Sequence, residues 1–236
     1  MNPPRTVLSP DGRELAELAA ALVRPAAHRE ATGGTGEGTG VGTGSGRRRL
    51  VGLCGAPGVG KSLLAQALVA LMPGSVAVPM DGFHLADVTL DAQGLRDRKG
   101  APETFDARGY AALLHRLGEH APWPVYAPGF ARDLEQPLAG AITVPPETDV
   151  VVTEGNYLLL DRPEWRAVRA ELDEVWFLVT DEQVRRARLV DRHVAFGKDP
   201  DVARAWVDRV DQPNADLVAA ACRRADRVVD LTAWVP

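Results

Sequence analysis

The chain has 236 residues and a formal net charge of −5 at pH 7, and 45% of its residues are hydrophobic and 25% charged. These values exclude a disordered chain and predict a folded domain that needs no disulfide bonds. The acidic balance disfavours a nucleic-acid partner, and no apolar run reaches the roughly 18–20 residues of a membrane span. We therefore expect a cytoplasmic protein without a membrane partner, with Cys54 and Cys222 both reduced. The sequence leaves a homodimer open.

The N-terminal part of the chain divides into two segments of different composition. Residues 1–30 are expected to contain a helix at 10–24, because apolar residues recur there at helical spacing: Leu15, Leu18, Ala19 and Leu22. Residues 31–46 alternate glycine with threonine, serine and glutamate, which is typical of a flexible linker. Residues 47–236 then form the main domain.

From residue 47 onward, short apolar runs alternate with helical periodicity. Continuous apolar or β-branched runs predict strands at 49–54, 76–80, 149–153, 174–179 and 227–231. Helical spacing of leucines predicts helices at 61–71 and 106–118. Runs that are apolar at every position are typical of strands covered on both faces. We therefore predict an α/β fold in which helices cover both sides of a parallel sheet.

One octet between the first of these strands and the helix at 61–71 matches the pattern G-x-x-x-x-G-K-[ST]. It comprises Gly55, Ala56, Pro57, Gly58, Val59, Gly60, Lys61 and Ser62, with Leu63 following. Glycines let backbone N–H groups converge on phosphate oxygens, and the helix N-terminus adds its positive end. Lys61 is expected to reach the β- and γ-phosphates, and the Ser62 hydroxyl to bind magnesium. The sequence therefore predicts binding of a nucleoside triphosphate with Mg²⁺.

Two acidic residues follow predicted strands. Asp81 comes after the run at 76–80, and Glu154 after the run at 149–153. Because the carboxyl ends of parallel strands meet at one edge of a sheet, both should lie near the phosphate loop. There Asp81 could accept a proton from an attacking hydroxyl, and Glu154 could bind magnesium together with Ser62. The alternatives are a turn-capping aspartate and a hydrogen-bonded structural glutamate.

Further polar segments could form the rest of a site. The basic segment 94–106 alone indicates only a solvated charge run, whereas 125–133 mixes aromatic residues with proline and glycine, which is typical of an adaptable pocket loop. Three arginines share one face of the helix that follows the strand at 174–179: Arg185, Arg188 and Arg192. They could close over a triphosphate as a lid, or the helix could simply face solvent. His84 and His193 are candidates for substrate contact.

Four sequence blocks, GAPGVGKS, MDGFH, RKGAPETFD and VVTEGNYLLL, occur in that order before the arginine helix. Together they resemble the phosphoribulokinase/uridine kinase/pantothenate kinase superfamily of P-loop kinases, including bacterial nucleoside/nucleotide kinase family proteins. The resemblance runs from about Arg48 to Asp230. It implies a three-layer P-loop NTPase fold with about five parallel strands and an Arg-rich lid helix.

The resemblance also implies roles for individual residues. Asp81 would be the general base, Ser62 and Glu154 would bind Mg²⁺, and Lys61 and Arg188 would be catalytic cations. The arginines Arg185, Arg188 and Arg192 would bind ATP from the lid. The residues implied around the acceptor are Asp81, His84, Arg98, Lys99, Tyr126, Arg132, Glu154 and Asn156.

We therefore expect an ATP-dependent kinase that transfers the γ-phosphoryl group to a hydroxyl of a small molecule. The acceptor could be a nucleoside, a sugar or a pantothenate-like alcohol, because the acceptor segments differ from both the uridine kinase and the pantothenate kinase patterns. The alternative is a nucleotide-switched ATPase whose closed lid recruits a protein partner and which has no small-molecule acceptor.

Overall fold

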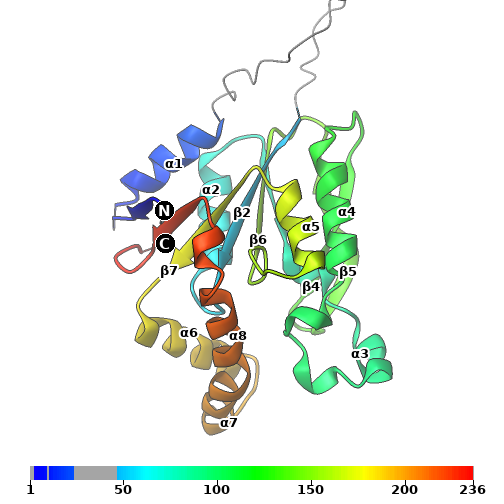
Figure 1. The fold of residues 1–236 in the computed structure, drawn as a ribbon, viewed down its shortest axis with the longest axis vertical. Helices are drawn as coiled ribbons and strands as arrows, with labels where there is room; N and C mark the ends of the chain where they lie inside the picture. Colours follow the sequence, from blue (N-terminus) through cyan, green and yellow to red (C-terminus); the bar gives the residue numbers. More distant parts are fainter. Residues whose placement is uncertain (1–2, 10, 24–46, 236) are drawn as a thin grey trace, which may run out of the picture.

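The computed structural model describes residues 3–9, 11–23 and 47–235 (Figure 1). The expected linker at 31–46 lies outside these residues, as does part of the expected N-terminal helix. Six parallel strands form the main sheet in the order β1-β8-β7-β2-β6-β3. Their bounds are β1 (Arg5–Val7), β2 (Arg49–Gly55), β3 (Ser75–Pro79), β6 (Val150–Gly155), β7 (Glu174–Val179) and β8 (Arg227–Asp230).

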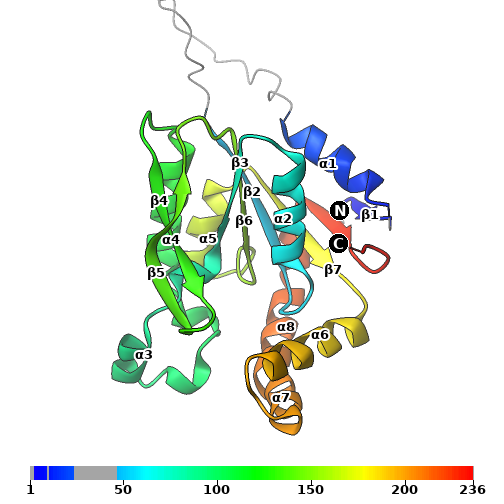
Figure 2. The same cartoon turned by 180° about the vertical axis from the view of Figure 1, so that it is seen from behind.

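Helices cover both faces of this sheet, which confirms the predicted three-layer α/β fold. On one face α4 (Ala107–Gly118), α5 (Pro163–Glu171) and α8 (Gln212–Ala219) contribute Tyr110, Trp165 and Val218 to a buried core (Figure 1). On the other face α1 (Arg13–Val23) and α2 (Lys61–Leu71) bury Leu18, Leu64 and Leu68 among other apolar side chains (Figure 2). Every residue of β6 is therefore buried, as expected for a parallel strand covered on both sides.

The sheet has six strands where about five were expected, because β1 adds an edge strand beside β8. Arg5 and Val7 are exposed and Thr6 is only partly buried, so the segment has no continuous apolar run. Pairing of Arg5 with Val228 and of Val7 with Asp230 fixes its register. The N-terminal segment thereby joins the sheet whose strand β2 leads into the phosphate loop.

Residues 125–133 do not form the loop expected from their proline and glycine content. They contain β4 (Val125–Ala131), which pairs antiparallel with β5 (Gln136–Val144) in a two-stranded sheet beside β3 and α4 (Figure 2). The register shifts between Ala127 and Gly129, so the bulge accommodates Pro128, which has no N–H group to donate. A proline at a bulge is compatible with a strand, which corrects the expectation.

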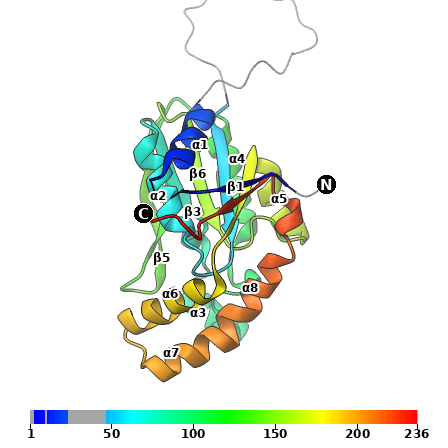
Figure 3. The same cartoon turned by 90° about the vertical axis from the view of Figure 1, so that its left-hand side faces the viewer.

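The remaining helices lie beyond the carboxyl ends of the strands (Figure 3). α3 (Asp87–Gln93) follows the 3₁₀ turn η1 (Met80–Phe83), while α6 (Glu182–Ala195), α7 (Pro200–Trp206) and the π-helical turn η4 (Val207–Asp211) lead into α8. The side chains of Asp106, Asp181 and Asp199 accept backbone N–H groups at the starts of α4, α6 and α7, which explains where these helices begin. Within the described residues, no helix combines the length and apolar character that crossing a membrane requires.

Candidate active site

The phosphate loop joins β2 to α2 at the carboxyl edge of the sheet. Gly58 and Gly60 have φ angles of 80° and 107°, which glycine adopts without strain. A Cβ atom on Gly58 would lie 2.7 Å from Leu189 Cγ and 2.8 Å from the carbonyl oxygen of Arg185, so α6 packs directly on the loop. α2 begins after Gly60 without a side-chain cap, which leaves its first N–H groups directed at the space where an anion would bind.

Lys61 is a buried cation at the first position of α2. Its Nζ donates to the carbonyl oxygens of Gly55 and Ala56 at 3.0 and 3.1 Å and to Oδ1 of Asn156 at 2.6 Å. Burial lowers the pKa of Lys61, while the nearby carboxylate of Glu154 acts in the opposite direction. Its hydrogen-bond partners are all neutral, so an incoming phosphate would supply the negative charge that this buried ammonium group lacks.

Ser62 and Glu154 form a pair of oxygen donors next to Lys61. The Ser62 hydroxyl donates to Oε1 of Glu154 at 2.8 Å, from the first turn of α2 to the end of β6. Burial raises the pKa of Glu154, and the neighbouring carboxylate of Asp81 raises it further. A hydroxyl beside a buried carboxylate is the type of donor set that Mg²⁺ prefers, so these two residues fit the metal that a triphosphate would bring.

Asp81 lies in η1, immediately after β3. Gly82 packs against the carbonyl oxygen of Pro128 so closely that a Cβ atom would overlap it, which fixes η1 on β4. The Asp81 carboxylate forms an ion pair with the guanidinium group of Arg132 from the end of β4. The β4–β5 hairpin thus positions both the aspartate and its cationic partner at the sheet edge.

His84 supports Asp81 from the other side of η1. Its Nδ1 lies 2.9 Å from the carbonyl oxygen of Asp81, and its ring centroid lies 4.0 Å from that of Phe105 and 4.9 Å from that of Phe130. Burial lowers the pKa of His84 below its ordinary value of 6.5. The imidazole is therefore neutral at pH 7, and Nδ1 donates to the carbonyl oxygen.

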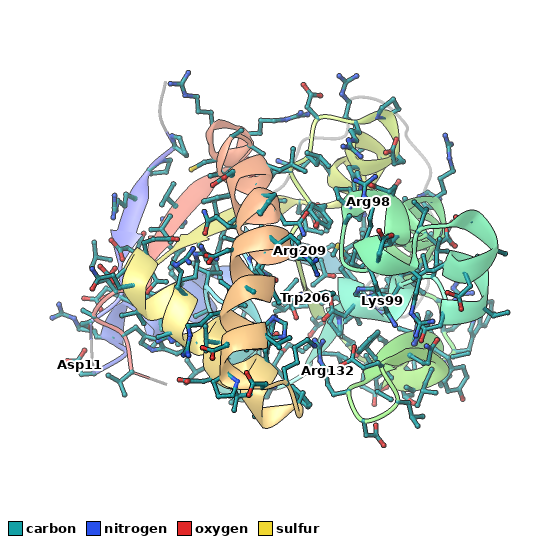
Figure 4. The ribbon with its side chains drawn as sticks, turned by 90° about the horizontal axis from the view of Figure 1, so that it is seen from below. Asp11, Arg98, Lys99, Arg132, Trp206 and Arg209 are labelled. Atoms are coloured by element: carbon teal, nitrogen blue, oxygen red, sulfur yellow. The ribbon has the colours of Figure 1, made fainter. Side chains whose placement is uncertain are left out.

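All these groups border one cavity of about 410 Å³ at the carboxyl edge of the sheet. The phosphate loop and the ends of β3 and β6 form its floor, and η1, α3 and β4 form one wall. The opposite wall comes from α6, α7 and η4. Figure 4 looks onto this edge. Lys99 and Arg132 lie on the wall that contains α3 and the β4–β5 hairpin, and Trp206 lies on the opposite wall, at the end of α7.

No protein-family model matches the chain. Over 193 residues it is 37% identical to uncharacterized protein YggC of Escherichia coli K12, covering 79% of each chain. It is 35% identical over 161 residues to "Putative uridine kinase C227.14" of Schizosaccharomyces pombe, covering 64% of this chain and 68% of that protein. A crystal structure of a "putative fructose transport system kinase" from Silicibacter sp. TM1040 superposes with a TM-score of 0.76 at 38% identity, covering 91% of this chain and 98% of that one.

The chain belongs to the phosphoribulokinase/uridine kinase-like superfamily of P-loop kinases. The shared architecture accounts for the position of the cavity, because ligands of open parallel sheets bind at the carboxyl ends of the strands. The residues that the sequence singled out and that line the cavity of this P-loop kinase are Pro57, Gly58, Lys61, Ser62, Asp81, His84, Lys99, Arg132, Glu154, Asn156, Arg192 and His193.

The three arginines expected to form a lid in this P-loop kinase occupy different environments. Arg185 is buried and donates to the carbonyl oxygen of Pro57 at 3.0 Å and to Oε1 of Gln212 at 2.6 Å, so it connects α6 to the phosphate loop and to α8. Arg188 lies over Gly60, with Nη1 3.7 Å from where a Cβ atom would be. Only Arg192 of the three lines the cavity.

Two residues expected near the acceptor lie outside the cavity. Arg98 forms an ion pair with Glu103 and does not line it. Tyr126 points outward from β4 and is 59% exposed, because the neighbouring Val125 and Ala127 fill the buried face of the strand. In the P-loop, Val59 packs into the core, whereas Leu63, in the first turn of α2, is exposed.

The opposite wall of the cavity was largely missed by the sequence analysis. Trp206, Val210, Asp211 and Asn214 line it from the segment that spans η4. The five-residue π-helical turn changes which side chains face the cavity, and no motif in the sequence indicates such a turn. On the other wall Asp87, Arg96, Phe105, Phe130 and Glu135 were also missed as site residues.

Proposed function

We propose that this P-loop kinase uses ATP and Mg²⁺ to phosphorylate a hydroxyl group of a small molecule, with Asp81 as the general base. The observation that carries the proposal is the convergence of Lys61, Ser62, Glu154 and Asp81 on one cavity. The P-loop residues supply cationic and N–H groups for a triphosphate, and the carboxylate of Asp81 lies beside them.

The nucleotide end is proposed to work by positioning and charge neutralisation. The N–H groups of the loop and Lys61 would hold the β- and γ-phosphates, and Arg188 and Arg192 would approach them from α6. Ser62 and Glu154 would hold the metal, which when bound neutralises negative charge on the phosphate oxygens. Lys61 would exchange its neutral hydrogen-bond partners for phosphate oxygens, which restores a favourable environment for its charge.

Asp81 is proposed to accept the proton of the attacking hydroxyl. The acceptor oxygen forms a bond to the γ-phosphorus as the bond from that phosphorus to the bridging oxygen of ADP breaks, and the hydroxyl proton moves to the Asp81 carboxylate. Arg132 holds this carboxylate by an ion pair, and His84, neutral at pH 7, holds its backbone. Asn156 lines the same cavity, where its Oδ1 accepts from Nζ of Lys61.

The relatives support a small hydroxyl-bearing acceptor, because their names refer to uridine and to fructose transport. A cavity of about 410 Å³ is large enough for such a molecule. We therefore propose a nucleoside, a sugar or a pantothenate-like alcohol as the acceptor.

The direct test is ADP formation from ATP across a panel of nucleosides, ketoses, pantothenate and ribulose phosphates. We expect ADP release to depend on one class of acceptor. Asp81→Asn should lower kcat by about 10²–10⁴-fold while ATP still binds, because a positioned base contributes a rate factor of that size.

The matched control is Asp133→Asn in the exposed turn between β4 and β5, which should leave kcat unchanged. Near-normal turnover of Asp81→Asn would remove this residue from the mechanism. ATP hydrolysis that proceeds equally without any acceptor would instead favour a nucleotide-switched ATPase.

A further inference from the structure

The cations that line the cavity fall into two groups according to their partners. In the first group, Lys61 contacts only neutral oxygens, and neither Arg192 nor Lys198 forms an ion pair within the described part of the chain. Lys61 belongs to the P-loop, and the other two come from α6 and the segment that follows it. Within the described residues these three cations thus form no ion pair with a carboxylate, although Glu154 lies near Lys61.

The second group lies on the wall formed by η1, α3 and β4, and each member is already paired. Lys99 Nζ lies 2.6 Å from Oδ1 of Asp87 and also donates to the carbonyl oxygen of Glu135. Arg96 lies 2.7 Å from Oδ2 of the same Asp87. The third cation, Arg132, is paired with Asp81, as described above. Asp87 is therefore shared by two cations on this wall, and Asp91 also pairs with Arg96 at 3.3 Å.

This pairing determines what the wall can bind. A phosphate or carboxylate group on the acceptor would meet cations that are already paired with carboxylates, and it would face the carboxylates of Asp81, Asp87 and Glu135. Hydroxyl groups could instead donate to these carboxylates and accept from the guanidinium and ammonium groups. The ring of Phe130, with Lys99 Nζ at 5.7 Å and Arg132 Cζ at 4.9 Å from its centroid, offers an apolar surface for the carbon skeleton.

We propose that the acceptor of this kinase is a neutral, hydroxyl-rich molecule, and that Asp87 is the residue that selects against anionic acceptors. It does so by pairing with both Lys99 and Arg96 at the acceptor end of the cavity. The cations at the nucleotide end form no ion pair within the described residues and remain available to the triphosphate. The inference rests on the proposed function, because it assumes that the phosphate loop holds the nucleotide.

The test uses inorganic sulfate as a probe of the acceptor wall, which does not require the acceptor to be known. The protein is first saturated with Mg²⁺ and a non-hydrolysable ATP analogue, so that the P-loop is occupied, and sulfate is then titrated by calorimetry. We expect no sulfate binding to the wild-type complex. Asp87→Asn should create a sulfate site, because Lys99 and Arg96 lose the carboxylate that they share.

Two further variants separate charge selection from a general disturbance of α3. Asp91→Asn removes the other carboxylate that contacts Arg96. The Asp91 side chain is exposed and does not line the cavity, so this variant should create no sulfate site. In the double variant Asp87→Asn/Lys99→Met, the gained sulfate site should be lost again, because the uncompensated ammonium group is gone.

An independent measurement is kcat/KM for pairs of possible acceptors that differ only by a phosphate group. One pair is D-ribulose and D-ribulose 5-phosphate, and the other is uridine and uridine monophosphate. Wild-type protein should have the higher kcat/KM for the neutral member, and Asp87→Asn should shift that ratio about tenfold toward the phosphorylated member. Sulfate binding to the wild-type complex, no gain of sulfate binding in Asp87→Asn, or a wild-type preference for the phosphorylated member would each overturn the inference. Failure of the ATP analogue to bind would instead contradict the proposed function itself.

Discussion

At the scale of single residues, the site combines two buried groups of opposite charge, and burial shifts the pKa of each toward its neutral form. Burial disfavours the charged forms of both Lys61 and Glu154, since it lowers the pKa of the lysine and raises that of the glutamate. Both effects are reversed when opposite charges enter, and Mg²⁺ with a triphosphate brings one of each sign. We therefore expect a magnesium-bound triphosphate to raise the pKa of Lys61 and to lower that of Glu154.

His84 gives a prediction about pH. Burial lowers its pKa in the folded protein below the value of 6.5 that applies when the chain is unfolded. Protonation therefore favours the unfolded state, so the contribution of His84 is fully present above about pH 6.5 and is lost as the pH falls through the folded pKa. His84→Asn, which keeps a donor for the Asp81 carbonyl oxygen, should lower stability by about 1–2 kcal/mol at pH 7.5.

The measurement is urea unfolding of both proteins between pH 5 and pH 8. The loss of stability on acidification should be smaller in His84→Asn than in the wild type. His115→Asn, at an exposed position on α4, serves as the control and should follow the wild-type pH dependence. An unchanged slope in His84→Asn would contradict the assignment of a buried neutral imidazole.

At the scale of elements, α6 is attached to the phosphate loop by Leu189 and by the buried side chain of Arg185. Arg185→Ala should lower stability by about 2–3 kcal/mol, because it leaves the carbonyl oxygen of Pro57 without its buried donor and removes one of the two arginine donors to Oε1 of Gln212. It should also raise the KM for ATP, since α6 no longer holds the loop. Urea unfolding and ATP-dependent kinetics check the two effects.

The control for this prediction is Arg186→Ala on the same helix. Arg186 is more exposed, pairs with Asp208 at the surface, and donates to Oε1 of Gln212 at 3.1 Å, but it does not contact the phosphate loop. Since Arg185 still donates to that Oε1, the removal of Arg186 should cost less than about 1 kcal/mol. Equal losses in the two variants would mean that Arg185 does not connect α6 to the loop.

The packing and backbone geometry of individual elements could not be predicted from the sequence. Spacing placed Arg185, Arg188 and Arg192 on one face of a helix, but the packing of that helix on the loop decides which of them reaches the cavity. The spacing of apolar residues likewise did not indicate the π-helical turn η4. Such a turn is defined by its backbone hydrogen bonds and not by its amino-acid composition. The strand β4 was predicted as a loop because it contains Pro128, and a proline argues against a strand unless a bulge accommodates it.

At the scale of the whole molecule, the sequence predicted the layers of the fold and the floor of the site. Continuous apolar runs indicated the buried strands, and the carboxyl-edge rule then brought Asp81 and Glu154 to the phosphate loop. The edge strand β1 was missed because a short strand at the edge of a sheet needs no apolar run. Tertiary contacts between separate segments, such as Lys99 with Asp87, leave no pattern in the sequence.

The central claim is that the P-loop binds a magnesium-bound triphosphate through Lys61. Calorimetric titration with ATP, with and without Mg²⁺, tests it most directly, with Lys61→Ala as the comparison. The account predicts one ATP bound per chain, tighter binding with Mg²⁺, and at least about a tenfold loss of affinity in Lys61→Ala. An absence of ATP binding in the wild type, or equal affinities in the two proteins, would contradict it.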